Sequence, residues 1–368
     1  MTATARDGMR RRLAAVQQGM QAERIDLLVV GPSADMQYFL GRRLPLTERL
    51  SVLVIPRQGV PSVVLPELQV PLLADLPIEC QAVPWRETEK PVEQLAQLAK
   101  GCRRIAVSDQ FWSGFLLGLQ DLLPGIEYLN GSPVISRLRA IKDESELAFL
   151  REGGRRFDAL WQEFLKTEKL IGRTEYQIQL RLRDMMAAQG FESVGWCDVG
   201  SGPNGASPLH HWSHRAVEPG DVVVVDFAGS CQGYYMDTAH TVVAGEPHPD
   251  FIKLYDIVKR AHETATAAIR PGVPCEEVDR AARAVIEEAG YGPRFIHRTG
   301  HGLGIDGHEH PYIVAGNRQP LEPGMVFSNE PGIYIPGRWG VRIENIMAVT
   351  ADGSEGFQKI NRDLACLS

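Results

Sequence analysis

The sequence has no long apolar segment and no surplus of basic residues. No stretch approaches the ~20 apolar residues that a helix needs to cross a membrane, and the arginine-rich start lacks the apolar run of a signal peptide. The formal net charge of −7 argues against nucleic acid as the main partner, because phosphate groups attract basic surfaces. We therefore expect a cytoplasmic protein with neither a membrane nor a nucleic-acid partner.

Cysteine is scarce, and histidine is absent from the first half of the chain. The six cysteines form no CxxC pair, the spacing that zinc knuckles and redox motifs require. Reduced thiols therefore fit better than a disulfide framework. All ten histidines lie at or beyond His210. Chemistry that uses imidazole as a base or a metal ligand is expected only in the second half.

The length of 368 residues is sufficient for two domains. Residues 1–135 alternate short apolar strands with helical patterns, which predicts an α/β domain with a mixed sheet and flanking helices. Residues 136–144 are expected to be a linker. Residues 145–368 begin with an amphipathic helix, followed by a second helix that Gly190 ends, and these two are expected to pack on a sheet.

The segment GDVVVVDFAGSCQGYYMD, Gly220–Asp237, predicts a hairpin that carries two acids. A run of valines, typical of a buried strand, ends at Asp226. A turn centred in AGSCQG would place Asp226 and Asp237 roughly opposite each other, with Cβ atoms about 5 Å apart. Carboxylates that close must share a proton or a cation. A surface hairpin with two solvated acids is the alternative.

A second segment, Gly324–Thr350, repeats this pattern. Val326–Asn329 leads to Glu330, and after a turn near Gly337 a short strand leads to Glu344. The turn places Glu330 and Glu344 opposite each other. Four clustered anions are expensive without a counter-charge, so cations must lie among them.

Two further segments supply histidines. The glycine-rich segment FIHRTGHGLGIDGHEHPYI contains His297, His301, His308 and His310, and a polar loop brings His210, His211 and His214 to the valine strand. Neutral imidazole is a common metal ligand, although loop histidines are often only polar surface residues. Four carboxylates with one imidazole suit manganese, cobalt, iron or zinc. Such a set can bridge two ions ~3.5 Å apart, whose bridging water becomes a hydroxide that attacks a carbonyl carbon.

The second half resembles the pita-bread metallopeptidases, which include Xaa-Pro dipeptidase (prolidase), aminopeptidase P and methionine aminopeptidase. The matching motifs are GDVVVVDFAG, GYYMDTAHT, HRTGHGLGIDGHEHP, EPGIYIPG and VRIEN. The likeness covers about residues 145–368 and implies an α+β catalytic domain. The first half is similar to the creatinase/prolidase-type N-terminal domain. Methionine aminopeptidases lack that domain, so its presence favours the proline-specific branch.

The resemblance implies two divalent ions, manganese foremost and cobalt, zinc or iron as alternatives, on five ligands. The implied ligands are Asp226, Asp237, His301, Glu330 and Glu344. Asp226 would chelate one ion, Asp237 and Glu344 would bridge both, and His301 and Glu330 would complete the second. Glu330 would also steer the proton of the nucleophilic water.

Three other residues receive roles from the resemblance. His308 would donate a hydrogen bond to the scissile carbonyl or the oxyanion. The alternative is that His308 lies near the site and takes no part in the reaction. His297 is a further catalytic candidate and would line the substrate pocket. Arg342 would orient the bridging carboxylates, or would be only the counter-charge of a buried acid.

The chain departs from the family at three positions. Leu209 stands where a histidine usually follows proline, so either the loop shifts and His210 takes that role, or the role is lost. His240 replaces an arginine in DTAHT. Tyr312 stands where some dipeptidases have an arginine that could hold a product carboxylate, and Arg338 or a first-domain arginine could substitute. His210, Tyr312 and Arg342 are the substrate-binding candidates.

The expected activity is a dinuclear metallopeptidase, as a homodimer, that cleaves before proline in Xaa-Pro dipeptides or short peptides. The alternative on the same scaffold is a creatinase-like hydrolase or lyase that acts on C–N bonds of small molecules. The five ligands argue against its metal-free version. A third hypothesis is a binding protein with the fold of an inactive peptidase. Such a protein would be expected to have lost some of the metal-ligand residues.

Overall fold

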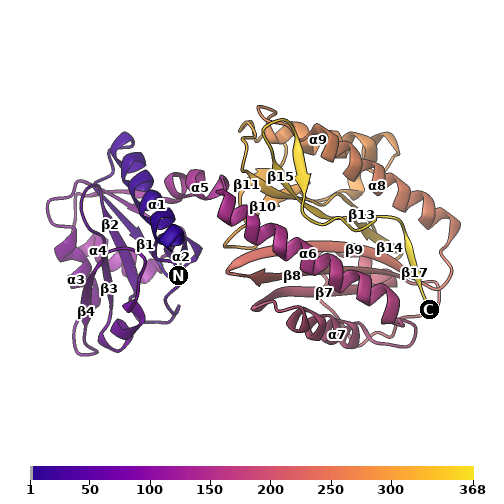
Figure 1. Ribbon diagram of the computed structural model, residues 1–368, viewed down its shortest axis with the longest axis horizontal. Helices are drawn as coiled ribbons and strands as arrows, with labels where there is room; N and C mark the ends of the chain where they lie inside the picture. Colours follow the sequence, from indigo (N-terminus) through magenta and orange to yellow (C-terminus); the bar gives the residue numbers. More distant parts are fainter. Residues whose placement is uncertain (1–2) are drawn as a thin grey trace. The chain divides into compact units, whose positions relative to one another are not determined.

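The computed structural model describes residues 3–368, which form two compact units; one reaches Arg139 and the other covers Ala140–Ser368 (Figure 1). Each unit has its own hydrophobic core. The expected linker, residues 136–144, contains the end of helix α5 (Ser132–Ala140) and the start of α6 (Glu144–Thr167). Within residues 3–368, no helix combines the length and the apolarity that crossing a membrane requires.

The first unit is an α/β domain on one mixed six-stranded sheet, as its alternating pattern predicts. The strand order is β4-β3-β2-β1-β5-β6, in which β1 pairs antiparallel with β2 and parallel with β5. The strands are β1 (Leu27–Val30), β2 (Val52–Pro56), β3 (Ser62–Pro66), β4 (Gln81–Trp85), β5 (Arg104–Val107) and β6 (Glu127–Asn130). The other helices are α1 (Ala3–Ala22), α2 (Ala34–Leu40), α3 (Pro91–Leu98), α4 (Ser113–Leu122) and the 3-10 helix η1 (Glu67–Leu73).

The second unit has an α+β architecture with sheets in the orders β17-β9-β8-β7, β11-β10-β12-β15-β16 and β13-β14. The strands are β7 (Ser193–Ser201), β8 (Val222–Cys231), β9 (Tyr234–Ala244), β10 (Gly300–Gly302), β11 (Glu309–Ile313), β12 (Val326–Asn329), β13 (Gly332–Ile335), β14 (Trp339–Arg342), β15 (Asn345–Val349), β16 (Ser354–Gly356) and β17 (Ala365–Leu367). The helices after α6 are α7 (Glu175–Ala188), α8 (Pro249–Ala268), α9 (Cys275–Glu288) and the 3-10 helices η2 (Gly202–Ala206) and η3 (Gly292–Arg294).

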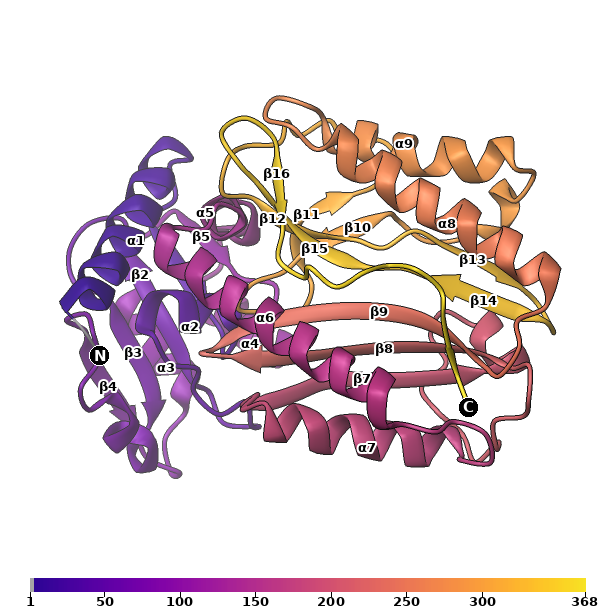
Figure 2. The same ribbon diagram turned by 45° about the vertical axis from the view of Figure 1, so that its right-hand side comes forward.

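Two pairs of helices cover the sheets of the second unit. Helices α6 and α7 lie against β7, β8 and β9, whereas α8 and α9 lie over the strands that follow them (Figure 2). Helix α6 begins at a capping box formed by Asp143 and Glu146, which satisfies two free N–H groups. Its apolar face is buried as predicted, through Leu147, Leu150, Phe157, Leu160 and Phe164.

A glycine lets α6 approach β9 closely. A Cβ atom at Gly153 would lie 2.4 Å from Met236 Cγ, so a larger residue would push the helix away from the sheet.

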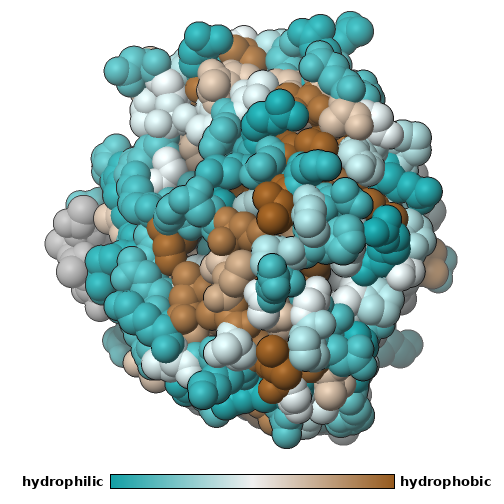
Figure 3. All heavy atoms as spheres, turned by 90° about the vertical axis from the view of Figure 1, so that its right-hand side faces the viewer, coloured by the Kyte–Doolittle hydropathy of each residue, from teal (hydrophilic) through white to brown (hydrophobic). Residues whose placement is uncertain are grey.

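On the face at the right of Figure 1, apolar side chains gather in the middle and hydrophilic ones surround them (Figure 3). Patches of this kind commonly mark contact sites for other molecules.

The register of the first acidic hairpin differs from the expectation. Gln232 and Gly233, with φ of 55° and 79°, form a tight turn, in which both residues adopt the left-handed conformation that two-residue hairpins need. Asp226 therefore pairs with Ala239, and Asp237 pairs with Ala228. The predicted spacing of about 5 Å between the Cβ atoms of Asp226 and Asp237 is therefore wrong, because it belongs to a directly paired position. The two acids are diagonal neighbours on the same face of the sheet, since paired residues share a face.

The second acidic hairpin has the predicted register. Asn329 pairs with Asn345 in one ladder, and Gly332 pairs with Arg342 in the other. Both ladders keep the same register, so Glu330 and Glu344 lie across from each other at the junction between them. This junction brings two glutamates to the edge of the β8–β9 sheet, where the Glu344 N–H donates to the Ala239 carbonyl.

Candidate metal centre

Three buried ligand atoms converge from β9, from β10 and from the junction between β14 and β15. One carboxylate oxygen each of Asp237 and Glu344 and one ring nitrogen of His301 lie within 4.8 Å of one another. Glu330 lies beside them, with its Oε1 atom 3.3 Å from His301 Nε2, and Asp237 Oδ2 is 3.7 Å from the same nitrogen. The fold thus brings four of the five expected ligands together within or next to one cluster.

The donor set fits a divalent cation. Asp237 Oδ1 and Glu344 Oε1 are buried without a hydrogen-bond partner in residues 3–368, and unsatisfied buried carboxylate oxygens are costly. His301 Nδ1 lies 3.0 Å from the Gly302 carbonyl. This nitrogen must therefore carry the proton, which leaves Nε2 with a free lone pair towards the acids. Orientation of an imidazole by its second nitrogen is typical of metal ligands.

The electrostatics of these groups reflect their crowding. Burial, and then the charges of neighbouring acids, hold the pKa of Asp237 and that of Glu344 well above the usual range. Burial also raises the pKa of Glu330 and lowers the pKa of His301 to about 4. Carboxylates in this state repel each other when ionised, and a cation among them would remove that repulsion.

Asp226, the fifth expected ligand, has two strong donors of its own. Its Oδ1 accepts from Trp196 Nε1 at 2.7 Å, and its Oδ2 accepts from Arg342 Nη2 at 2.5 Å. Asp226 lies on the same sheet face as Asp237. The contact of Arg342 is thus with Asp226 and with neither of the carboxylates expected to bridge, which matches the counter-charge alternative.

Arg342 continues into a hydrogen-bonded chain. Its Nη1 atom donates to the Tyr334 hydroxyl at 2.8 Å, and that hydroxyl is 2.9 Å from His297 Nε2. His297 Nδ1 is 2.7 Å from the Arg298 carbonyl and so carries the proton; Tyr334 therefore donates to Nε2. Burial lowers the pKa of His297 and raises that of Tyr334 to about 12. Sequence reasoning missed Tyr334, although it lies within the EPGIYIPG motif.

His308 reaches the cluster through ring stacking. Its ring lies 3.9 Å from the His301 ring, centroid to centroid, and 5.1 Å from Trp196. Its outer side remains exposed. Partial loss of water around the ring, and then the neighbouring His301, lower the pKa of His308 to about 4. His308 is therefore neutral at pH 7 and keeps one N–H to donate.

The histidine loop is held elsewhere. His210 Nε2 is 2.8 Å from Glu175 Oε2 on α7, so the His210 ring is hydrogen-bonded to that buried acid. Leu209 is 82% exposed. His211 Nδ1 is 2.9 Å from Asp198 Oδ1. Burial would raise the pKa of Glu175, but hydrogen bonds led by that of Ser213 lower it. Glu175 and Asp198 were not predicted, because neither belongs to a motif.

The other two departures from the family pattern have different environments. His240 lies on the opposite face of β9, where its ring stacks on Trp161 at 4.0 Å and burial lowers its pKa. Tyr312 pairs with His301 across β10 and β11, and the Arg298 guanidinium lies 4.3 Å from the centre of its ring. Arg338, one of the two substitutes considered for that arginine, stacks on Trp339.

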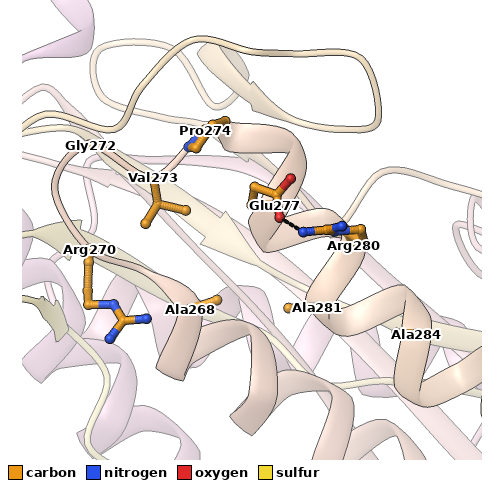
Figure 4. A pocket seen from close by; sticks show the side chains of 9 residues that line it. All are labelled: Ala268, Arg270, Gly272, Val273, Pro274, Glu277, Arg280, Ala281 and Ala284. Atoms are coloured by element: carbon orange, nitrogen blue, oxygen red, sulfur yellow. Dashed lines mark hydrogen bonds and ion pairs between the residues drawn. The ribbon is translucent and has the colours of Figure 1, made fainter.

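A hollow of about 690 Å³ on the surface of α8 and α9 is separate from this cluster (Figure 4). Ala268, Val273, Pro274, Ala281 and Ala284 supply much of its apolar lining, and Glu277 and Arg280 pair at its edge. None of the predicted site residues lines it.

Comparisons with known proteins are consistent with this geometry. Residues 148–351 match the family model of Metallopeptidase family M24, and residues 12–141 match that of the Creatinase/Prolidase N-terminal domain. The chain is 42% identical to the probable dipeptidase PepE of Mycobacterium tuberculosis over 92% of this chain and 91% of that protein. It is 31% identical to an Xaa-Pro dipeptidase of Lactobacillus helveticus, over 95% of this chain and 97% of that protein.

A solved structure confirms the fold class. Dipeptidase PepE from Mycobacterium ulcerans superposes with a TM-score of 0.94 and 38% sequence identity, covering 98% of each chain. The likeness extends over both units of the chain. The predicted combination of a creatinase-type N-terminal domain and a pita-bread catalytic domain is therefore confirmed.

Proposed function

The chain belongs to metallopeptidase family M24, and from this premise we propose that it is a dinuclear metal-dependent peptidase that cleaves Xaa-Pro dipeptides. The observation that carries the proposal is the buried cluster of Asp237, His301 and Glu344, with its two unpartnered carboxylate oxygens. Similar proteins named dipeptidase and Xaa-Pro dipeptidase support the choice of substrate.

Asp226, Asp237, His301, Glu330 and Glu344 would hold the metal. Two divalent ions in this cluster, manganese as the preferred candidate, would polarise the scissile carbonyl and lower the pKa of a water molecule towards neutrality. Glu330, whose pKa burial raises, would take up the proton that the attacking water loses. His301 can act as a ligand at neutral pH because its Nε2 atom stays unprotonated.

His308 and His297 would serve the substrate rather than the metal. His308 is neutral at pH 7 and stacks on His301, so its remaining N–H can donate to the oxygen that becomes negative in the transition state. His297 is held by Tyr334 and by the Arg298 carbonyl. This support would hold the ring at one wall of the proposed substrate pocket.

A dipeptide differs from a longer peptide by a carboxylate directly after the second residue. Arg298 lies over the Tyr312 ring, and Tyr312 pairs with the ligand His301. A guanidinium in this place can bind that carboxylate in bidentate fashion. Trp196, next to His308, offers an apolar surface to a proline ring, whose nitrogen has no hydrogen to donate.

The test is an activity screen after loading with Mn²⁺, Co²⁺ or Zn²⁺. We expect hydrolysis of Ala-Pro and Leu-Pro, slower hydrolysis of Leu-Pro-Gly, and none of Leu-Ala. The variant Asp237→Ala should lose activity and bound metal, as measured by mass spectrometry. Wild-type turnover in that variant would refute the site, and equal rates on Leu-Ala and Leu-Pro would refute the proline specificity. Light scattering checks the predicted homodimer.

A further inference from the structure

An additional acid lies beside the metal centre. In the register of β7 and β8, Asp198 pairs with Asp226. Paired residues point to the same face, with Cβ atoms about 5 Å apart. Asp198 therefore lies on the face that carries Asp226 and Asp237, one strand further out, because β7 is the edge strand of this sheet.

The surroundings of Asp198 differ from those of Asp226. Asp226 is neutralised by Arg342, whereas the hydrogen bond of Asp198 comes from His211 Nδ1 at 2.9 Å. This contact is fixed by the backbone, since the Val199 N–H donates to the His211 carbonyl at 2.6 Å. Among residues 3–368, no hydrogen bond reaches Asp198 Oδ2. The Asp198 side chain is 17% exposed and that of His211 is 77% exposed, so a solute can reach this carboxylate.

We propose that Asp198 is a specificity residue that binds a positively charged nitrogen on the first residue of the substrate. The proposal rests on the proposed function, because the first residue must lie next to the scissile carbonyl at the centre. A carboxylate with an open oxygen attracts a cationic nitrogen and repels acidic groups. Hydrogen bonding from His211 holds the carboxylate in place. The nitrogen is either the ammonium of a basic side chain or the α-ammonium, and both present the same chemistry.

The experiment compares Asp198→Asn with the wild type on lysyl-proline and norleucyl-proline. These substrates have side chains of similar length, and only lysine carries the extra charge. We expect the variant to lose about tenfold or more in kcat/KM on lysyl-proline, as for one charge-assisted hydrogen bond, mainly through KM. The value for norleucyl-proline should stay within about twofold if the side chain is the partner. The bound metal should be unchanged by mass spectrometry.

Hexanoyl-proline, which lacks the α-ammonium, separates the two sources. If the α-ammonium is the partner, both dipeptides lose affinity equally, and inhibition by hexanoyl-proline stays unchanged. The exposed Asp352→Asn, in the loop after β15, removes the same charge from a distant surface and should have no effect. An unchanged kcat/KM on both dipeptides, or an equal loss for hexanoyl-proline, would overturn the proposal.

Calorimetry keeps this inference separate from the proposed function. If the wild type cleaves neither dipeptide, the proposed function fails, and binding of L-lysine and L-norleucine then decides the role of Asp198. The role would be supported if the wild type binds lysine more tightly than norleucine and Asp198→Asn abolishes this difference. It would also be supported if Asp198→Asn weakens the binding of both amino acids but leaves the binding of hexanoate unchanged. Equal binding of every ligand by both proteins would overturn it.

Discussion

The metal-free protein should become more stable when one acid of the centre is neutralised. In Glu344→Gln, the side chain keeps its shape and loses its charge. Glu344 and Asp237 have ligand oxygens within 4.8 Å of each other, and both are buried. The substitution therefore removes a repulsion from the folded state that the unfolded chain does not have.

The size of this effect follows from Coulomb's law. Two unit charges no more than 4.8 Å apart repel by at least about 3.5 kcal/mol at an effective dielectric constant of about 20. Part of this cost is avoided because the acids with raised pKa values retain protons. We expect Glu344→Gln to raise the free energy of unfolding of the metal-free protein by about 1–3 kcal/mol. For a unit of this size, the melting temperature would rise by several degrees, up to about 10 °C.

The same reasoning fixes the sign of the pH dependence. The pKa values of Asp237, Glu330 and Glu344 are raised in the folded state, so the folded protein holds more protons than the unfolded chain. Stability of the metal-free wild type should fall as the pH rises from about 4, the unfolded value, through the raised values. The fall should be shallower in Glu344→Gln.

The assay is scanning calorimetry in a chelator, with Glu309→Gln as the matched control. Glu309 is also buried, but its Oε1 atom accepts from Lys142 Nζ at 2.8 Å. Removing its charge leaves a buried ammonium unpaired, which typically costs 3–5 kcal/mol. The two identical substitutions should shift the melting temperature in opposite directions. A lower melting temperature for Glu344→Gln in chelator would refute the claim that the acids repel each other. Added Mn²⁺ should stabilise the wild type more than the variant.

Two further predictions concern catalysis. His308→Ala should keep its bound metal, measured by mass spectrometry, and lose about 100-fold or more in kcat, as for one oxyanion donor; an unchanged kcat would leave His308 without a chemical role. Arg298→Leu should raise KM for Leu-Pro about tenfold or more and have little effect on Leu-Pro amide, which lacks the carboxylate. Equal effects on both substrates would contradict carboxylate binding by Arg298.

Local sequence patterns determined much of the second unit. The apolar spacing from Leu147 to Phe164 fixed the buried face of α6, because helical periodicity depends only on neighbouring residues. The turn near Gly337 likewise fixed the register that sets Glu330 across from Glu344. Hairpin patterns also predicted the two pairs of acids, because a hairpin brings residues close in sequence to the same face. That His301 joins these acids was implied by the resemblance to the family.

Only the tertiary structure decided contacts between distant segments. The register of the first acidic hairpin is a local exception within one segment: its turn lies at Gln232 and Gly233, both left-handed, which sets Asp226 diagonal to Asp237. The position of Asp198 beside Asp226 depends on pairing between strands far apart in the chain. The hydrogen bond between His210 and Glu175 depends on the packing of α7. Such contacts arise from long-range packing, which the order of residues along one segment does not specify.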